Sequence, residues 1–332
     1  MREWARHAND SPLYVHLADV IAGSSELLRV MSRMVHLPRP NVLFGGVHYL
    51  LMNGRGPDLA RFYPSLTAQP EPLDGVAVPF TEFVMAHEEE LVEIGRTRLT
   101  QTNECRRCAI LLPGVWLTGL SRFHLVDIGA SAGLNLAIDR FRYRWGDVEW
   151  GPPDSPVTLE CEMRGVPPQP RPIEVLSRVG LDLNPVDVGD PDERAWLDAL
   201  VWPEHAERRR RLRKALSMVS SMDIEMVRGS AVDTLGPVLD GLPNGDPVVV
   251  MDSFVMNQLT VAERGRIGEI LEMARGKRAV ARVSLWHMVR DAVWSKLAID
   301  RGEGIEIVGE GHPHGEWLDL STPRRTPGSG PR

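Results

Sequence analysis

The sequence predicts an α/β protein in which a doubly wound, Rossmann-like sheet ends in an antiparallel hairpin and follows an N-terminal helical domain. Three observations lead to this fold class. Residues 1–119 carry apolar residues at helical spacing, residues 120–321 alternate strand patterns with helical ones, and only a short turn separates the last two strand patterns. We therefore expect a helical cap or substrate domain followed by a sheet domain.

In the N-terminal part, apolar residues recur every three or four positions, which is typical of helices that bury one face. Clusters of glycine and proline separate these stretches. The expected helices span residues 13–35, 42–52, 80–99 and 105–117. We expect this helical domain to cover a ligand site on the sheet domain.

From residue 123 onwards the pattern changes. Residues 123–128 are a short apolar run ended by a glycine, which favours a buried strand, and residues 132–141 then favour a helix. Further strands are expected at residues 224–227, 247–251, 279–285, 305–308 and 317–320, with helices at 261–274 and 288–299. Such alternation predicts a parallel sheet. The turn at 309–315 is too short for a crossover helix, so the last two strands should pair antiparallel.

A proline-rich insertion at about residues 142–190 follows the first strand and helix. It should contain a hairpin in which residues 142–150 pair with residues 157–163. A polar helix is expected next, at residues 192–218, and we interpret its basic run as a solvated face because acidic residues lie among the arginines. The tail at residues 322–332 is rich in proline, glycine and arginine and is expected to be disordered.

The composition excludes several classes of protein. Hydrophobic residues make up 43% and charged residues 25%, as in globular proteins, and the net charge of −7 gives no positive field for nucleic acid or an anionic membrane. No apolar run is long enough to span a membrane, and the N-terminus lacks the pattern of a signal peptide. The three cysteines form neither a disulfide framework nor a recognisable metal site. We expect a cytoplasmic protein with a small-molecule partner; the sequence does not indicate the oligomeric state.

The turn after the first strand is the most informative segment. The acid Asp127 stands next to the last residue of the strand, two positions before a run of small residues begins at Gly129. In a doubly wound fold this turn lies at the carboxyl edge of the sheet, where glycines let the backbone approach a nucleotide. The residues expected to contact such a ligand are Asp127, Gly129, Ala130, Ser131 and Gly133.

The same turn allows a second interpretation. Gly129, Ser131 and Gly133 form the Gly-x-Ser-x-Gly pattern of a nucleophile elbow, which would make Ser131 the nucleophile of an α/β serine hydrolase. Asp252 with His312 or His314 would complete the order serine, acid, histidine. Two features disfavour this alternative. A nucleophile elbow normally follows several strands, whereas the residues before this turn are expected to be mostly helical, and a hydrolase would give Asp127 no role.

Several segments resemble a known bacterial family. They are residues 101–104 with Arg107, 127–136, 139–141, 180–185 and 201–204. With them the chain resembles the family called domain of unknown function 2332 and, through it, the class I methyltransferases that depend on S-adenosylmethionine (SAM). Their loop has the form Asp/Glu-x-Gly-x-Gly-x-Gly, with Ser131 here in place of the middle glycine. The resemblance implies SAM as the cofactor and in-line methyl transfer to an unidentified small molecule, without a metal.

The resemblance also implies roles for four acidic or polar residues. Asp182 ends a segment that looks like the second strand, where an acid accepts hydrogen bonds from the ribose of SAM, although it stands unusually far from Gly129. Glu162 is the alternative ribose acid if its strand lies in the main sheet. Ser230 follows the third strand, near the expected adenine, and Asp252 follows the fourth, near the expected methyl group; as an N-cap, Asp252 would instead be structural.

The substrate side of the site is less defined. We expect substrate contacts from Gln101, Asn103 and Arg107. Three residues are candidates for a general base by their location: Glu104, His312 and His314. A non-catalytic SAM-binding regulatory protein is a further alternative.

Overall fold

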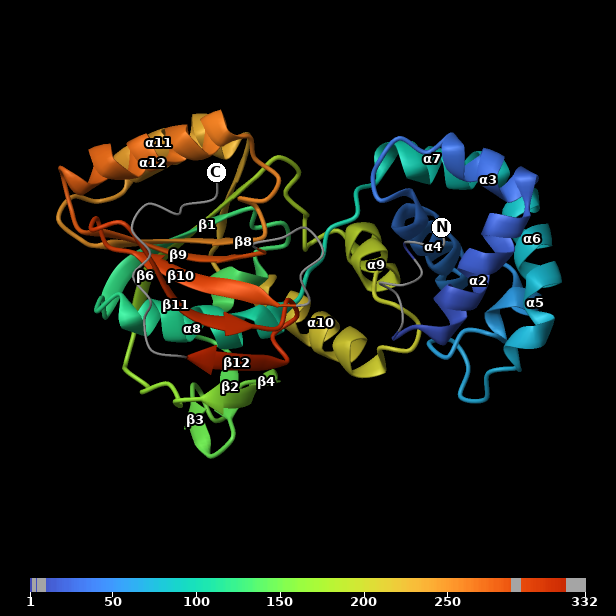
Figure 1. The fold of residues 1–332 in the computed structure, drawn as a ribbon, viewed down its shortest axis with the longest axis horizontal. Coiled ribbons are helices and arrows are strands. Elements are labelled where there is room, and N and C mark those ends of the chain that lie inside the picture. Colours follow the sequence, from blue (N-terminus) through green and yellow to red (C-terminus); the bar gives the residue numbers. More distant parts are fainter. Residues whose placement is uncertain (2–3, 5–9, 288–293, 321–332) are drawn as a thin grey trace. The chain divides into compact units, whose positions relative to one another are not determined.

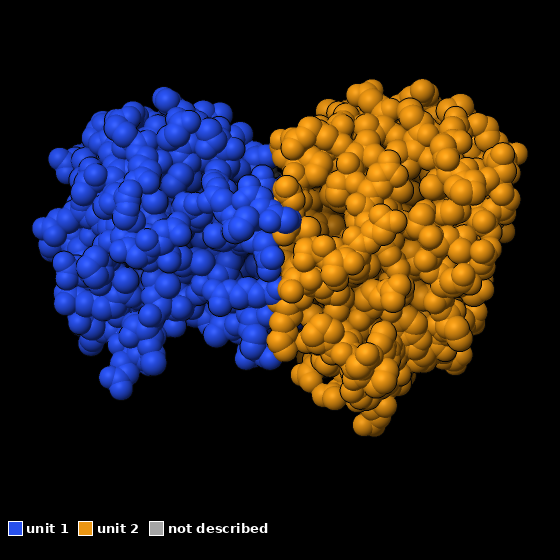
Figure 2. Space-filling model, turned by 180° about the vertical axis from the view of Figure 1, so that it is seen from behind, with its two compact units in different colours: residues 1–102, 189–213 blue, residues 103–188, 214–332 orange. Residues whose placement is uncertain are grey.

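The computed structural model describes residues 1, 4, 10–287 and 294–320, and these residues form two compact units (Figures 1 and 2). Unit 1 comprises Met1–Thr102 and Gly189–Arg213, and unit 2 comprises Asn103–Val188 and the chain from Lys214 onwards. Residues 103–119, which the sequence groups with the helices, belong to unit 2, and residues 189–213 return to unit 1. The predicted disordered tail lies outside the described residues.

Unit 1 is helical. Its elements are α2 (Pro12–Gly23), α3 (Ser25–Ser32), α4 (Arg39–Met52), α5 (Pro57–Ala60), the short helix η1 (Leu73–Gly75), α6 (Ala77–Ala86), α7 (Glu88–Thr97) and α9 (Pro191–Ala199), and α10 (Ala206–Val219) begins in it. The expected helix at 13–35 is divided at Ser24, whose side chain accepts a hydrogen bond from Leu27 N and so caps a new helix. The expected helices at 80–99 and 192–218 are likewise each divided in two.

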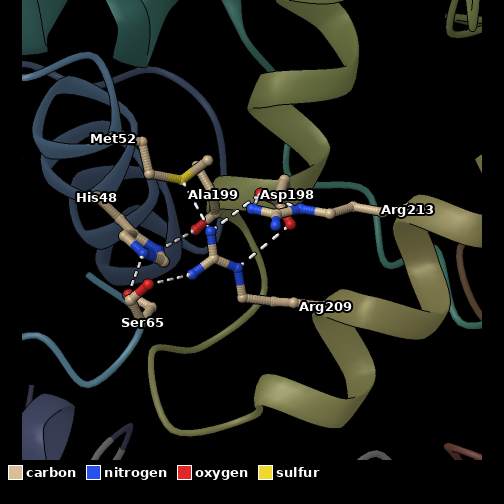
Figure 3. A network of polar contacts seen from close by, with 7 residues as sticks. All are labelled: His48, Met52, Ser65, Asp198, Ala199, Arg209 and Arg213. Atoms are coloured by element: carbon tan, nitrogen blue, oxygen red, sulfur yellow. Dashed lines mark hydrogen bonds and ion pairs between the residues drawn. The ribbon is translucent and has the colours of Figure 1, made fainter. Parts of the chain in front are cut away.

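The core of unit 1 is mainly apolar but encloses a polar network (Figure 3). Asp198 on α9 is only 4% exposed, and its carboxylate accepts hydrogen bonds from Arg209 Nη2 at 2.9 Å and Arg213 Nη2 at 2.5 Å. Arg209 is 6% exposed, so the sequence-based interpretation of this basic run as a solvated face is wrong at that residue. Helical spacing turns it inward, where Asp198 compensates its charge.

The second half of the same network centres on His48 of α4 (Figure 3). Its Nδ1 lies 2.9 Å from the carbonyl oxygen of Ala199 and its Nε2 lies 2.8 Å from Ser65 Oγ. Since a carbonyl can only accept, Nδ1 carries the hydrogen and Nε2 accepts from the serine. Burial and the neighbouring Arg209 lower the pKa of His48 to about 4, which keeps the imidazole neutral.

Unit 2 contains a nine-stranded sheet in the order β5-β12-β11-β10-β9-β8-β1-β6-β7. The strands are β1 (Arg122–Ile128), β5 (Glu162–Gly165), β6 (Glu174–Asp182), β7 (Glu225–Arg228), β8 (Val248–Ser253), β9 (Val280–Trp286), β10 (Ser295–Asp300), β11 (Ile305–Gly311) and β12 (Trp317–Leu320). From β7 to β9 neighbouring strands are parallel, and β9, β10, β11 and β12 pair antiparallel. The five parallel strands follow the order 3-2-1-4-5 of a doubly wound fold, which confirms the predicted fold class.

Helices cover both faces of this sheet (Figure 1). On one face, α11 (Ala231–Gly241) and α12 (Val261–Arg275) pack on a core that includes Val126, Ile128 and Val250. On the other face lies α8 (Cys108–Leu117). This helix packs closely on the sheet at Gly114, where an added Cβ would come within 2.7 Å of Val283 on β9. The apolar runs of β1 and β8 therefore fit strands buried on both sides.

Three local predictions are wrong. The helix expected at 132–141 is only the short 3-10 helix η3 (Leu134–Ala137). Residues 295–299, expected to be helical, form strand β10, because a short apolar run fits either period and here it lies between two antiparallel partners. In the insertion, β2 (Arg142–Trp145) forms its hairpin with β3 (Val148–Trp150), and β4 (Thr158–Glu160) joins β2 in parallel.

Candidate functional site

The chain reverses its strand order at β1. It proceeds from β1 to β6 and β7 on one side and then returns to β8 on the other. In open parallel sheets, ligands bind beyond the carboxyl ends of the strands at such a point, because the loops diverge there and leave a crevice. The sequence-predicted loop, residues 129–133, follows β1 at this position.

The loop has three residues with positive φ. They are Gly129 at 75°, Ser131 at 51° and Gly133 at 72°. A Cβ on Gly129 would come within 2.1 Å of Val255 Cγ2, so glycine is required there for space as well as for conformation. At Gly133 the nearest atom would be 3.7 Å away, so the backbone conformation alone favours glycine.

The backbone N–H groups of the loop donate within unit 2. Those of Gly129 and Ala130 donate to the carbonyl oxygen of Leu181, at 2.7 and 3.1 Å. That of Gly133 donates to the carbonyl oxygen of Ala130 at 2.8 Å. The loop is therefore fastened to the end of the neighbouring strand β6.

Side chains take the two remaining N–H groups. Ser131 N donates to Asp182 Oδ2 at 2.8 Å, and Ala132 N donates to Asn103 Oδ1 at 3.3 Å. The amide nitrogen of the same side chain, Asn103 Nδ2, donates to Ser131 Oγ at 3.0 Å. Asp182 Oδ1 accepts from Asn184 N at 2.7 Å. All five backbone donors of the loop are thus in use, which leaves none of them for a phosphate group.

Asp127 is the most unusual group near the loop. It is fully buried, and neither carboxylate oxygen has a hydrogen-bond partner among the described residues. Burial raises its pKa well above the ordinary value. The side chain of Asn135, which is close but makes no hydrogen bond of regular geometry, opposes the shift in part, and the charges of Asp252 and Asp182 add to it. A buried carboxyl without a partner is costly, so it marks a place where a cation or donor can bind.

Asp252 is placed differently from Asp127. It pairs across the ladder with Ser284, and its side chain lies on the face that α11 and α12 cover. Its Oδ2 accepts hydrogen bonds from Arg282 Nε at 2.8 Å and Ser284 Oγ at 2.5 Å. The two buried acids of the central strands therefore point to opposite faces of the sheet.

The two predicted histidines lie in the turn between β11 and β12. That turn is held by the short helix η2 (Cys105–Arg107): Arg106 Nε donates to the carbonyl oxygen of His314 at 2.9 Å. Arg107 Nε likewise donates to the carbonyl oxygen of Pro313 at 3.0 Å. The ring centroids of His312 and His314 are 5.7 Å apart.

Arg107 also reaches the end of β8, where its guanidinium lies 4.4 Å from the ring centroid of Phe254. Phe254 has a positive φ of 63°, which is strained for an aromatic residue. Its ring is 4.7 Å from that of His287, whose pKa is lowered by burial. Phe254 and His287 were not among the predicted site residues, although they directly follow strands β8 and β9.

The remaining predicted residues lie elsewhere or have local partners. Glu162 is on β5 at the far edge of the sheet and pairs with Arg164, so Asp182, and not Glu162, ends the strand beside β1. Ser230 caps α11 by accepting from Val232 N. Buried Glu104 accepts from Arg106 N at the start of η2. Gln101 belongs to unit 1.

Metal-binding clusters and membrane-spanning helices are both absent from the described residues. No three histidine, cysteine, aspartate or glutamate side chains there are arranged to hold a metal ion. None of the described helices is both long and apolar enough to cross a membrane.

Comparison with known proteins identifies the family. No curated protein matches the chain. One family model does, over residues 1–320, and it is described as an uncharacterized protein conserved in bacteria, DUF2332. Because the family match spans nearly the whole chain, this protein belongs to the DUF2332 family.

Proposed function

We propose that unit 2 binds SAM at the carboxyl edge of β1 and β6, and that the protein is a cytoplasmic SAM-dependent methyltransferase acting on a small molecule. One observation carries this proposal: the glycine-containing loop after β1 is fastened to Asp182 at the end of β6, at the reversal point of a 3-2-1-4-5 sheet. The resemblance of the loop to that of class I methyltransferases agrees with it.

The chemistry of the loop supports a ligand without phosphate. Its five backbone donors are already in use, whereas a dinucleotide would need several of them free for its pyrophosphate. SAM has no phosphate and carries positive charge on its sulfonium and its ammonium group. The buried carboxyl of Asp127, which has no hydrogen-bond partner among the described residues, fits a cationic ligand.

Asp182 retains the capacity to bind a ribose. An ionised carboxylate has about four acceptor positions, and the N–H groups of Ser131 and Asn184 occupy two of them. The remaining two are enough for the two hydroxyl groups of a ribose. The same side chain would then hold both the loop and the ligand.

SAM supplies an activated methyl group on a sulfonium sulfur. The chain has to orient an acceptor in line with the sulfur–carbon bond, exclude water and, where the acceptor loses a proton, take that proton. Glu104, His312 and His314 remain candidates for the base. His287 joins them, because its lowered pKa keeps the ring neutral and able to accept a proton.

A serine hydrolase is the second candidate, and the positive φ of Ser131 favours it, since a nucleophile elbow strains its serine in this way. Two contacts oppose it. Ser131 Oγ accepts a hydrogen bond from Asn103 and donates to no histidine among the described residues. The N–H group of Ala132, which would stabilise an oxyanion, donates to the same asparagine.

Calorimetric titration of the full chain with SAM and S-adenosylhomocysteine tests the proposal. We expect micromolar binding that is lost in Gly133→Trp, because the indole would fill the space beside the loop. Gly245→Trp is the matched control: Gly245 also has a positive φ, a Cβ there would meet no atom within 4 Å, and the residue precedes the amino end of β8.

The outcomes separate the three functions. Absence of binding by the folded wild-type protein, or equal loss in both tryptophan variants, overturns the SAM site. Binding without methyl transfer to any component of a metabolite extract indicates the regulatory alternative. Labelling by a fluorophosphonate that disappears in Ser131→Ala indicates the hydrolase.

A further inference from the structure

A cavity of about 470 Å³ lies in unit 2, away from the loop after β1. Its walls are one side of α12 and the sheet face formed by β9, β10 and the start of β11. This volume falls within the range of about 300–1,000 Å³ that is common for small-molecule sites. The lining includes apolar side chains, among them Met256, Leu271 and Ile299.

On its helix side the cavity is lined by two glycines, and larger side chains at these positions would fill it. Gly265 and Gly268 are one helical turn apart on α12, and both line the cavity. A Cβ on either glycine would meet no atom within 4 Å. Glycine weakens a helix interior, and nothing packed against these two positions requires it. The cavity is therefore open on this side because the sequence has glycine at these two positions of α12.

The sheet side supplies a hydrogen-bond donor without an acceptor. Trp286 at the end of β9 is 3% exposed and lines the cavity, and its buried Nε1 donates to no atom of the described residues. Buried donors in folded proteins almost always have a partner, in the protein or in a ligand or water. The buried indole N–H group of Trp286 therefore indicates that a hydrogen-bond acceptor which is not part of the described residues binds here.

Three arginines line the cavity, together with the acids Glu272 and Asp300. Arg282 is paired with Asp252, and Arg275 is paired with both Asp300 and Glu272. Arg264 forms no ion pair with the described residues; its Nη1 donates to the carbonyl oxygens of Met256 and Leu259, and its buried Nε has no acceptor among the described residues. Arg264 is therefore the arginine of the lining that has no ion-pair partner among the described residues.

We propose that this cavity binds a small amphipathic anion, with a carboxylate or similar acceptor group placed at Trp286 and Arg264 and an apolar body along Leu271 and Ile299. The site is independent of the proposed SAM site, because it lies under α12 whereas Asp127 points to the other face of the sheet. An anion there satisfies the two buried donors and compensates Arg264.

Calorimetric titration of the full chain with decanoate, decan-1-ol and decylamine tests the class of ligand. We expect decanoate to bind at least about tenfold more tightly than either of the others, since charge-assisted hydrogen bonds contribute roughly that much. Equal affinity for the three probes overturns the assignment of an anion. Absence of binding by all three overturns the site.

Two variants locate the site. Gly268→Phe should abolish decanoate binding by filling the cavity, and the absence of neighbours around that position lets the variant fold, which circular dichroism checks. Met273→Phe is the matched control on the same helix, because Met273 is 58% exposed and does not line the cavity. Retained binding in Gly268→Phe, or equal loss in both variants, refutes this location.

Trp286→Phe tests the donor itself. It keeps an aromatic ring but removes the N–H group, so decanoate should bind about tenfold more weakly while the affinity for decan-1-ol changes little. Equal weakening of both probes would show that the ring matters and the donor does not. Gly133→Trp should leave decanoate binding intact, which keeps this site distinguishable from the proposed SAM site.

Discussion

Asp198 of unit 1 and Asp127 of unit 2 are both buried, but the two are held in opposite ways. Asp198 in unit 1 is 4% exposed and receives hydrogen bonds from two arginines, whereas Asp127 in unit 2 is fully buried and receives none from the described residues. Burial disfavours ionisation of both. At Asp198 the hydrogen bonds with Arg209 and Arg213 outweigh burial and lower the pKa, but at Asp127 burial dominates and raises it.

The difference separates a structural acid from a candidate functional one. A compensated carboxylate stabilises the fold that surrounds it, because its removal would leave buried arginine charge behind. A buried carboxyl without a partner lowers the stability, so its presence beside the loop, at the carboxyl ends of the parallel strands, is better explained by a ligand. Substitutions at four positions test this contrast, from the largest expected effect to the smallest.

Asp198→Asn should lower the free energy of unfolding by about 3–5 kcal/mol at pH 7, since Arg209 would remain buried without its counter-charge. Urea denaturation followed by tryptophan fluorescence measures this. Asp19→Asn, at an exposed position of α2 in the same unit, should change stability by less than about 0.5 kcal/mol. Similar small effects of both variants would show that the buried pair is not structural.

His48 adds a pH window to the same network. Because folding lowers its pKa to about 4, the unfolded chain binds the proton more readily, and stability falls as the pH drops from about 6.5 towards 4. The loss should approach about 3 kcal/mol and should be missing in His48→Gln. Identical pH profiles of the two proteins in that window would contradict the neutral, buried histidine. The loss due to Asp198 comes at lower pH, below its ordinary pKa.

Asp127→Asn should have the opposite sign from Asp198→Asn. The amide cannot ionise, so the variant avoids the cost of burying a carboxylate charge, and its stability should rise by about 1–3 kcal/mol at neutral pH. Because folding raises the pKa of Asp127, the gain should grow as the pH rises above the ordinary value of 3.8 and vanish at lower pH. The variant should also lose SAM binding. Destabilisation at pH 7 would mean that Asp127 is compensated and structural.

The smallest effect concerns the loop after Asp127. Ser131→Ala keeps the positive φ but loses the hydrogen bond from Asn103, so stability should fall by about 1 kcal/mol. In Ser131→Gly the relief of backbone strain should offset that loss, leaving stability within about 0.5 kcal/mol of wild type. Thermal unfolding compares the two. If glycine is no better than alanine, the serine backbone is not strained.

Much of the region around the loop follows from local sequence. The apolar run at 123–128 predicts β1, since a buried parallel strand needs apolar residues on both faces. The glycines at 129 and 133 predict a tight turn, since glycine adopts positive φ without strain. The resemblance to a family pattern predicts an acid at a strand end, and Asp182 does end β6.

Other features depend on residues that are distant in the chain. The partners of the loop, Asn103 and Asp182, come from segments on either side of it, and no local pattern indicates that the asparagine amide would occupy both Ser131 and Ala132. The placement of Glu162 at the sheet edge follows from its pairing with β12, which is far away in sequence. Periodicity also offers no means of choosing helix or strand for residues 295–299.

The sequence by itself determined the α/β class, the strand that leads into the loop and the turn that only glycines adopt easily, because hydrophobic period and backbone conformation are properties of neighbouring residues. Only the tertiary structure decided which buried charges are compensated. Asp198 meets its arginines across the α9–α10 turn, Asp127 meets none among the described residues, and the cavity beside α12 exists because strands from distant segments form its floor. The electrostatic and packing environment of a side chain depends on these long-range contacts, which local sequence does not encode.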